Sequence, residues 1–283
     1  MKQPKVLTVE PLFPLKPPSN IQNILVIGCG GTGSYIIPNL VRLLVNSKQP
    51  VCLTLADADT VETKNLIRQN FIKSDVGKNK AEALAQRYSS AFGTQIQFLT
   101  KYLESADDVA KALKNARVSN VSYSSSVPLI ISCVDNIKAR AFMVEALRFH
   151  YPNGGYIIDC GNEDVSGQVL LSCLTDMDDP STGVYRTPHL FEVFPELVER
   201  AKTDKLASEL SCAEMAESSN QFGFVNLNAA TFALNFVYDL LSGNPISTYM
   251  VEFSIKNKFS QRTLTKSSLQ AWPACGWKLK IPK

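Results

Sequence analysis

Val26-Ile-Gly-Cys-Gly-Gly-Thr-Gly33 is the segment from which the architecture of this chain can be worked out. An apolar run at 23–27 precedes its glycines, and a segment with helical spacing follows them. Glycines between a strand and a helix let the backbone turn tightly and approach a phosphate, which the free N–H groups and the helix dipole favour. The segment predicts a nucleotide on a turn made by Gly28, Gly30, Gly31 and Gly33. By itself this turn fits NAD, FAD or ATP.

A second polar segment, 57–69, narrows the kind of nucleotide. Asp57 follows an apolar run at 51–56, and an acid at the end of the second strand commonly accepts hydrogen bonds from ribose hydroxyls. The chain continues with Asp59 and with Asn65-Leu-Ile-Arg-Gln69, and Lys80 follows in Asp75-Val-Gly-Lys-Asn-Lys80.

Arg68 and Lys80 place cations where a triphosphate would lie. An enzyme that expels pyrophosphate needs such charges, whereas a hydride-transfer enzyme does not. Taken singly, either residue would be read as a solvated surface cation.

Cys133-Val-Asp135-Asn136 follows the apolar run at 129–133. The carboxyl end of a strand near the switch point of an open α/β sheet is where ligands meet the protein. Asp135 at that place can hold Mg²⁺ against phosphates. The alternative is that it only caps the following helix.

The alternation of apolar runs and amphipathic segments predicts a doubly wound α/β fold with a mostly parallel, Rossmann-like sheet covered by helices on both faces. Strands are expected at 23–27, 51–56, 96–99, 129–133 and 156–160, and helices at 34–45, 76–92, 107–116 and 138–150. Pro38 should remove one backbone donor from an early turn of the first helix.

The pattern changes after residue 160. Strand-like segments at 168–174, 249–255 and 261–265 flank an irregular stretch and an apolar helix at 222–241. We expect a proline-rich arm at 1–20 and a single adenylation domain at 21–283, in which 176–220 is a crossover or lid insertion.

Composition excludes several classes. Of 283 residues, 45% are hydrophobic and 19% charged, as in ordinary soluble globular proteins. A net charge of +3 without a long basic run indicates neither nucleic-acid nor membrane partners. The apolar helix at 222–241 contains three asparagines and an aspartate, which argue against a membrane span. Seven widely spaced cysteines without a signal peptide favour the cytoplasm.

These segments, in this order, resemble the ThiF/MoeB/HesA and ubiquitin-activating-enzyme superfamily over about residues 20–175. The matching motifs are the glycine turn, Asp57-x-Asp59-x-Val, Asn65-Leu-x-Arg68-Gln69, Asp75-Val-Gly-x-x-Lys80-Ala and Cys-x-Asp135-Asn136-x-x-x-Arg140. Within the superfamily, the chain most resembles the ThiF-family proteins of bacterial PRTRC cassettes.

The resemblance implies a reaction: the C-terminal glycine carboxylate of a ubiquitin-like or sulfur-carrier β-grasp protein attacks the α-phosphate of ATP-Mg, giving an acyl-adenylate and pyrophosphate. It implies ribose binding by Asp57 and Mg²⁺ at Asp135. It further implies phosphate contacts from Asn65, Arg68 and Lys80, support from Asp59 and Gln69, and a nucleotide-site place for Asn136.

Some members of the superfamily then transfer the acyl group to a cysteine, and a conjugating-enzyme-like partner can follow. Leu210-Ser-Cys212-Ala-Glu214 lies where relatives often carry a Thr-Cys-x-x-Ala segment, which makes Cys212 the candidate nucleophile. The alternative is a small buried residue at a loop-to-helix junction. Glu209 and Glu214 would raise the pKa of this thiol and so count against activation.

The chain departs from the superfamily pattern in two ways. Relatives often bind zinc through two CxxC pairs, but only Cys173 and Cys275 lie near those places, so we expect no zinc. Relatives also lend an N-terminal arginine to a partner subunit, yet residues 1–22 contain no arginine, only Lys2, Lys5 and Lys16. A homodimer is still expected. The two histidines lie outside all of these motifs.

Two alternatives stay open from the sequence. One is an NAD(P)- or FAD-dependent oxidoreductase that uses the same glycine turn and has no use for Arg68 and Lys80. The other is a non-catalytic scaffold that binds a nucleotide or a partner without turnover.

Overall fold

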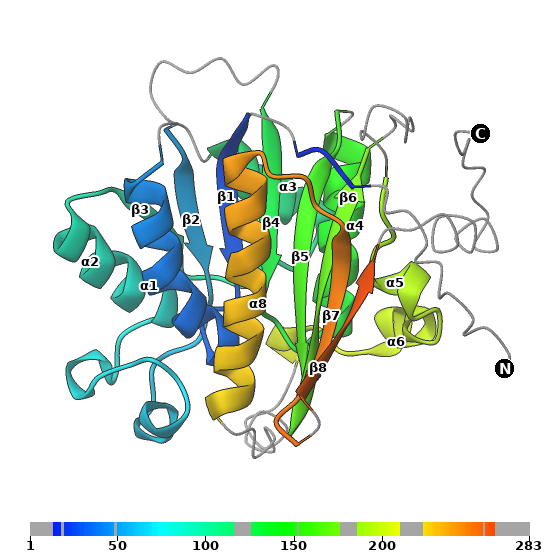
Figure 1. Ribbon diagram of the computed structural model, residues 1–283. Coiled ribbons are helices and arrows are strands. Elements are labelled where there is room, and N and C mark those ends of the chain that lie inside the picture. Colours follow the sequence, from blue (N-terminus) through cyan, green and yellow to red (C-terminus); the bar gives the residue numbers. More distant parts are fainter. Residues whose placement is uncertain are drawn as a thin grey trace, which may run out of the picture.

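An eight-stranded sheet runs through the molecule in the order β3-β2-β1-β4-β5-β6-β7-β8 (Figure 1). The computed structural model describes residues 14–17, 20–47, 50–115, 126–151, 153–175, 186–209, 223–256 and 258–263. The strands are β1 (Ile21–Ile27), β2 (Cys52–Ala56), β3 (Ile96–Leu99), β4 (Val127–Ser132), β5 (Gly155–Asn162), β6 (Ser166–Leu174), β7 (Thr248–Ser254) and β8 (Lys258–Thr263). The five strands β3, β2, β1, β4 and β5 pair in parallel, in that order across the sheet. Strands β6, β7 and β8 extend the sheet beyond β5 in antiparallel pairing. The predicted doubly wound, mostly parallel fold is confirmed.

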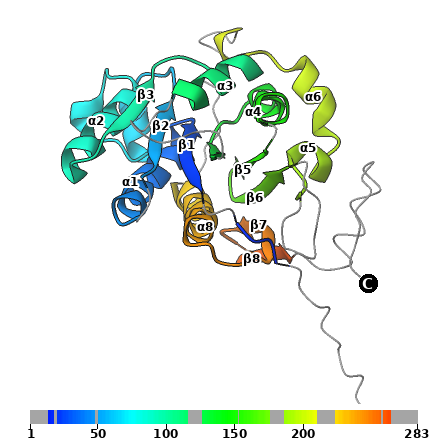
Figure 2. The same cartoon turned by 90° about the horizontal axis from the view of Figure 1, so that it is seen from above.

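Helices cover both faces of the sheet. Helices α1, α2 and α8 lie on one face, and α3 and α4 lie on the other (Figures 1 and 2). The helices are α1 (Gly31–Val45), α2 (Lys80–Phe92), α3 (Ala106–Asn115), α4 (Ile137–His150), α5 (Leu190–Val193), α6 (Leu197–Thr203) and α8 (Gly223–Ser242), with 3₁₀ turns η1 (Thr63–Ile67), η2 (Lys73–Asp75) and η4 (Ala207–Glu209). No helix of the described ranges is both long enough and apolar enough to cross a membrane.

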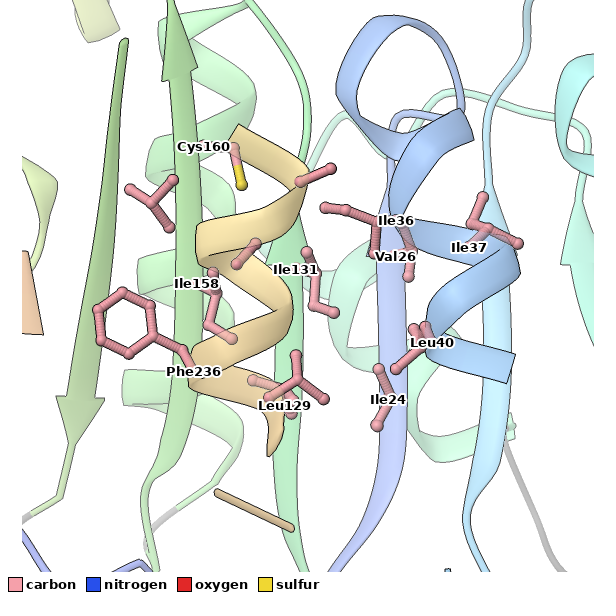
Figure 3. Close-up of a cluster of buried hydrophobic side chains, with 14 of the residues drawn as sticks. Ile24, Val26, Ile36, Ile37, Leu40, Leu129, Ile131, Ile158, Cys160 and Phe236 are labelled. Carbon is pink, nitrogen blue, oxygen red and sulfur yellow. The ribbon is translucent and has the colours of Figure 1, made fainter. Parts of the chain in front are cut away.

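The central strands are buried on both faces, which explains why their sequences are continuous apolar runs rather than alternating ones. Along β1, Ile24 and Val26 point toward α1 and α8, while Leu25 and Ile27 pack under α3 and α4. Figure 3 shows part of the apolar cluster between the sheet and helices α1 and α8, in which Phe236 of α8 and residues of α1 lie over β1, β4 and β5. Side chains on one strand alternate between two separate cores because the strand period is two.

The order of the strands places a topological switch point between β1 and β4. From β1 the chain moves outward to β2 and β3, then returns to pair β4 with the other edge of β1. Loops that leave β1 and β4 therefore diverge, and a crevice at the carboxyl ends of these strands is the general ligand position of such sheets. The glycine turn follows β1, and Asp135 follows β4.

Two helix boundaries differ from the prediction by more than one residue. Helix α2 begins at Lys80 rather than at residue 76, because Gly77 has a φ of +91° and Asn79 caps the helix by accepting a hydrogen bond from the Glu82 backbone N–H. Helix α1 begins at Gly31, so Pro38 lies inside it rather than in an early turn.

The terminal arm and the insertion are described only in part. Within the arm expected at 1–20, Leu15 pairs with Ile246 through two backbone hydrogen bonds of 2.7 and 2.8 Å. Within the insertion expected at 176–220, residues 186–209 form α5, α6 and η4, and α6 lies beside α4 (Figure 2).

Candidate functional site

The glycine turn connects β1 to α1 in a conformation that side chains would obstruct. Gly28 has a φ of +90°, and a Cβ added there would lie 2.6 Å from the carbonyl oxygen of Cys133. A Cβ at Gly33 would lie 2.0 Å from the carbonyl oxygen of Gly28. These two glycines are therefore required by the close approach of the turn, the start of α1 and the end of β4. Helix α1 begins at Gly31, beside the switch point, and its N-cap Gly30 makes no side-chain cap hydrogen bond. The N-terminus of a helix is a general position for binding phosphate.

The carboxylate of Asp57 is bonded to this turn. Its Oδ2 accepts a hydrogen bond from the backbone N–H of Cys29 at 2.6 Å, and its Oδ1 accepts one from the N–H of Asp59 at 2.8 Å. Burial raises the pKa of Asp57, and the nearby positive charge of Lys80 opposes that rise. Asp57 lies at the end of β2, as predicted, and is held rigidly beside the turn.

Lys80 forms the second part of the site. Its side chain is buried, and Nζ lies 2.7 Å from Oδ2 of Asp59. Its backbone N–H donates to the Asp59 carbonyl at 2.9 Å, and the Asn79 side-chain amide bonds the carbonyls of both Asp57 and Asp59. The start of α2 is thus fixed to the end of β2. The structure brings Asp57, Asp59 and Lys80 together as one charged group.

Tyr102, which the sequence motifs did not include, completes this group. Its hydroxyl donates a 2.5 Å hydrogen bond to Oδ1 of Asp59, the carboxylate oxygen that does not face Lys80. Burial acts to raise the pKa of Asp59, but the charge of Lys80 and the hydrogen bonds from Lys80 and Tyr102 outweigh it and hold the pKa below its usual range. Asp59 is therefore an anion at neutral pH.

The segment that carries Asn65, Arg68 and Gln69 is fastened to α1. Asn65 is buried, and its Oδ1 accepts a 2.8 Å hydrogen bond from the backbone N–H of Glu62, which closes η1. Arg68 is half-buried, and α8 begins against its backbone, because the Cβ position of Gly223 lies 3.9 Å from the Arg68 Cα. The structure thus places Arg68 between η1 and the start of α8.

Asn70 makes the attachment, and no sequence motif included it. Pro38 has no N–H to donate to the carbonyl of Ser34, and the Asn70 side-chain amide donates to that carbonyl at 3.2 Å instead. The backbone N–H of Asn70 donates to the Ser34 hydroxyl at 2.9 Å. Pro38 inside the helix signals that the Ser34 carbonyl needs another donor, but the sequence does not indicate that Asn70, far along the chain, supplies it.

Two buried side-chain amides flank the glycine turn. The amide of Gln69 lies 3.6 Å from the Cβ position of Gly30, and that of Asn226 lies 2.9 Å from the Cβ position of Gly31. Asn226 accepts hydrogen bonds at Oδ1 from Thr32 at 3.3 Å and from Asn162 at 2.9 Å. Polar side chains from β5 and α8 therefore meet at the start of α1, inside an otherwise apolar layer.

At the end of β4, the structure distinguishes Asp135 from its neighbour. The cap of α4 is Asn136, whose Oδ1 accepts from the Ala139 N–H at 2.9 Å, so the exposed carboxylate of Asp135 is not used for capping. Arg140 is buried, pairs with Asp159 at 3.1 Å and donates to the Val134 carbonyl at 2.6 and 3.0 Å. Arg140 thereby fixes the backbone immediately before Asp135.

Residues 186–209 are tied across this end of the sheet. The Asn136 side-chain amide donates to the carbonyl of Lys205 at 2.8 Å. Ser208 donates to the Glu104 carboxylate through its backbone N–H at 2.9 Å and its hydroxyl at 2.8 Å. Glu104 follows β3 and Asn136 follows β4, so the segment spans the carboxyl ends of two strands, at the same end of the sheet as the glycine turn.

The cysteines of the described ranges are free thiols: Cys29, Cys52, Cys133, Cys160 and Cys173. Burial raises the pKa of both Cys29 and Cys173, so neither has the character of a nucleophile. Cys212 and Cys275 lie outside the described residues. Among the residues that the structure covers, no group of three or more His, Cys, Asp or Glu side chains could hold a metal ion.

A glycine turn at the switch point, an acid at the end of β2 and a buried lysine at the start of α2 lie together in a doubly wound α/β domain, at the place where such sheets generally bind ligands. Residues 19–272 match the model of the ThiF family, and the chain belongs to that family.

Curated relatives include activating enzymes for ubiquitin-like modifiers. The chain is 26% identical to ubiquitin-like modifier-activating enzyme 5 of Drosophila willistoni over 242 residues, which cover 83% of this chain and 55% of that protein. It is 32% identical to the NEDD8-activating enzyme E1 catalytic subunit of Saccharomyces cerevisiae over 152 residues, 52% of this chain and 46% of that protein. The chain thus spans about half the length of these relatives or less.

Solved structures show the same fold. A crystal structure of E. coli MccB with ATP has a TM-score of 0.58 and 16% identity, covering 87% of this chain and 65% of that one. A crystal structure of PaaA has a TM-score of 0.57 and 14% identity, with 87% and 64% covered. The predicted superfamily is confirmed, whereas the resemblance to the PRTRC subfamily stays a prediction.

Proposed function

We propose that this chain is an ATP-dependent adenylyltransferase that activates the C-terminal glycine carboxylate of a small ubiquitin-like or sulfur-carrier β-grasp protein. The observation that carries the proposal is the buried Lys80 beside Asp57 and Asp59 at the edge of the glycine turn. Asp57 and Asp59 raise the pKa of Lys80 against the effect of burial, so a charged ammonium group lies beside the glycine turn. A dinucleotide oxidoreductase needs the acid at this place but not the lysine, so the pair favours a nucleotide with a leaving pyrophosphate.

The names of the relatives support this reading. Two of them are activating enzymes for ubiquitin-like modifiers, and a structural neighbour was solved with ATP. We infer that Asp57 binds the ribose hydroxyls and that Asn65, Arg68 and Lys80 bind the phosphates. The two carboxylate oxygens of Asp57 already accept backbone hydrogen bonds, so their remaining lone pairs would take the ribose hydroxyls.

In the proposed reaction, a carboxylate oxygen of the terminal glycine attacks the α-phosphorus of ATP. A new C(O)–O–P bond forms, the bond from the α-phosphorus to the bridging oxygen breaks, and pyrophosphate leaves with that electron pair. Lys80 and Arg68 stabilise the charge that develops on the leaving group, and the first N–H groups of α1 hold a phosphate in place. Asp59 and Gln69 support these groups from behind. No general base is required, because the attacking carboxylate is already ionised.

Asp135 is the proposed magnesium ligand. It is an exposed carboxylate at the switch point, and the capping role that could have occupied it belongs to Asn136. Mg²⁺ is often held by one or two carboxylates together with substrate phosphates, so this single acid fits. Bound Mg²⁺ would neutralise phosphate charge. Asn136 itself serves the cap and the segment at Lys205, which makes its predicted nucleotide-site role indirect.

The resemblance to the ubiquitin-activating-enzyme superfamily also supports steps that follow adenylation. The activated carboxylate would pass to Cys212 as a thioester, and a conjugating-enzyme-like partner could then receive it. The active form would be a homodimer in the cytoplasm, without nucleic-acid or membrane partners and without zinc.

Nucleotide binding and ATP–pyrophosphate exchange test the proposal together. The wild-type protein should bind ATP-Mg in preference to NAD⁺ or FAD, and should exchange labelled pyrophosphate into ATP when a cognate carrier with a C-terminal glycine is present. NAD⁺ or FAD binding without exchange would favour the oxidoreductase, and ATP binding without exchange would favour a scaffold. For Cys212→Ala, we expect exchange to persist while the thioester is lost; retained transfer would eliminate the nucleophile.

A further inference from the structure

We propose that Tyr102 is a positioning residue of the adenylation site: its hydroxyl holds the carboxylate of Asp59 so that the ammonium group of Lys80 is fixed toward the phosphates. This inference rests on the proposed function, because it assigns a role to a residue that acts through Lys80. Tyr102 lies after β3, outside every motif by which the nucleotide site was predicted.

The contacts form a short chain of three side chains. The Tyr102 hydroxyl donates to Oδ1 of Asp59 at 2.5 Å, and Nζ of Lys80 donates to Oδ2 of the same carboxylate at 2.7 Å. Each oxygen of Asp59 therefore has its own donor, and the plane of the carboxylate is fixed from both sides. Hydrogen bonds to an ionised acceptor are shorter and about twice as strong as those between neutral groups.

Exposure explains why the hydroxyl is needed. The side chain of Asp59 is 42% exposed, whereas that of Lys80 is 9% exposed. Without the hydroxyl, the carboxylate could rotate toward water, and the buried ammonium would lose the partner that orients it. Asp57 is also nearby, but the carboxylate in direct contact with Nζ of Lys80, at 2.7 Å, is that of Asp59. Asp59 is thus the carboxylate that sets the position of Lys80, and Tyr102 sets the position of Asp59.

The backbone around Tyr102 is itself anchored. Leu103 is buried in the core under α3 and α4, and the next residue, Glu104, binds Ser208 through both carboxylate oxygens. The phenol therefore extends from a fixed loop toward the site. A purely packing role for Tyr102 would not need the hydroxyl, whereas the positioning role depends on it.

The role has a pH signature. The groups that face Asp59 are Asp57 from the end of β2, Lys80 from α2, Lys64 from η1 and Tyr102 from the loop after β3. Loss of the Tyr102 hydroxyl removes one of the interactions that lower the pKa of Asp59, so that pKa should rise. A carboxylate that must be ionised for activity then loses its charge at a higher pH, and the acid limb of the exchange rate should move upward.

The test compares Tyr102→Phe with Tyr238→Phe in carrier-dependent ATP–pyrophosphate exchange. Tyr238 is an exposed residue of α8 and belongs to none of the contacts of the proposed site, so its variant should match the wild type. We expect Tyr102→Phe to raise the KM for ATP about tenfold, the size of a lost charge-assisted hydrogen bond, with an upward shift of the acid limb of the exchange rate.

A double variant separates the positioning role of Tyr102 from a loss of stability in Tyr102→Phe. In the Asp59→Asn background, adding Tyr102→Phe should have no further effect on the KM for ATP, because the phenol acts through that carboxylate. An active wild type whose Tyr102→Phe variant keeps the wild-type KM and pH profile would overturn this inference alone. Additive effects in the double variant would do the same. A wild type that binds ATP but supports no exchange would overturn the proposed function, and the inference with it.

Discussion

His189 should make the stability of this protein depend on pH between 8 and 5. The ring is 6% exposed at the start of α5, and its nitrogens have no hydrogen-bond partner in the described part of the chain. Burial, with the guanidinium groups of Arg148 and Arg186, lowers the pKa of His189 to about 4 against the opposing charge of Glu192. The folded protein therefore keeps this ring neutral at a pH where the unfolded chain protonates it.

The difference in the pKa of His189 between the folded and unfolded states sets the sign and the size of the change in unfolding free energy. With a pKa near 6.5 unfolded and about 4 folded, the unfolded state binds more protons as the pH falls, so stability is lost on acidification. Between pH 8 and pH 5 the loss amounts to about 2 kcal/mol, before most carboxylates titrate. Urea unfolding at the two pH values measures it.

The matched variants are His189→Phe, which keeps a ring of similar size without a titrating group, and His150→Gln, which changes the only other histidine. The fall in unfolding free energy between the two pH values should disappear in His189→Phe and persist in His150→Gln. An equal fall in the wild type and in His189→Phe would show that the pH dependence does not come from the buried His189 imidazole.

Three further substitutions have defined outcomes. Arg140→Met should destabilise the fold by about 3–5 kcal/mol, because it leaves the buried Asp159 without its partner, and Asp159→Leu in the same chain should recover much of that loss in thermal unfolding. Asn70→Ala should cost about 1–2 kcal/mol, since the Ser34 carbonyl loses its donor, and should weaken ATP binding several-fold in calorimetry; unchanged binding would mean that this attachment does not position Arg68. Lys80→Met should lower the exchange rate at least a hundredfold while the protein still folds, and a smaller effect would remove Lys80 from the chemistry.

The fold could be predicted because its signals are local and repeated. Continuous apolar runs identify strands buried on both faces, and the glycine turn fixes the β1–α1 connection. The late start of α2 has a local cause, the positive φ of Gly77 and the cap at Asn79, and α1 begins three residues earlier than predicted, at Gly31. The Asn70 amide, by contrast, is a tertiary donor to the Ser34 carbonyl that Pro38 leaves without an N–H. Such donors come from distant parts of the chain and leave no periodic signal.

The site was predictable only in part for the same reason. Asp57, Asp59 and Lys80 were predicted from motifs, and the structure brings them together. Tyr102 and Asn226 reach the site from the loop after β3 and from α8, and nothing in their local sequence sets them apart from other tyrosines and asparagines. Their roles can be inferred only from the structure, in which the Tyr102 hydroxyl bonds the Asp59 carboxylate and the Asn226 amide packs against Gly31.

The most direct test of the central claim is ATP–pyrophosphate exchange driven by the C-terminus of the carrier protein. With wild-type protein and a small β-grasp carrier that ends in glycine, we expect exchange that needs Mg²⁺, that stops when the terminal glycine is deleted from the carrier, and that falls at least a hundredfold in Lys80→Met. Exchange that continues unchanged without the terminal glycine, or no exchange from a wild type that binds NAD⁺, would contradict adenylation of a carrier protein.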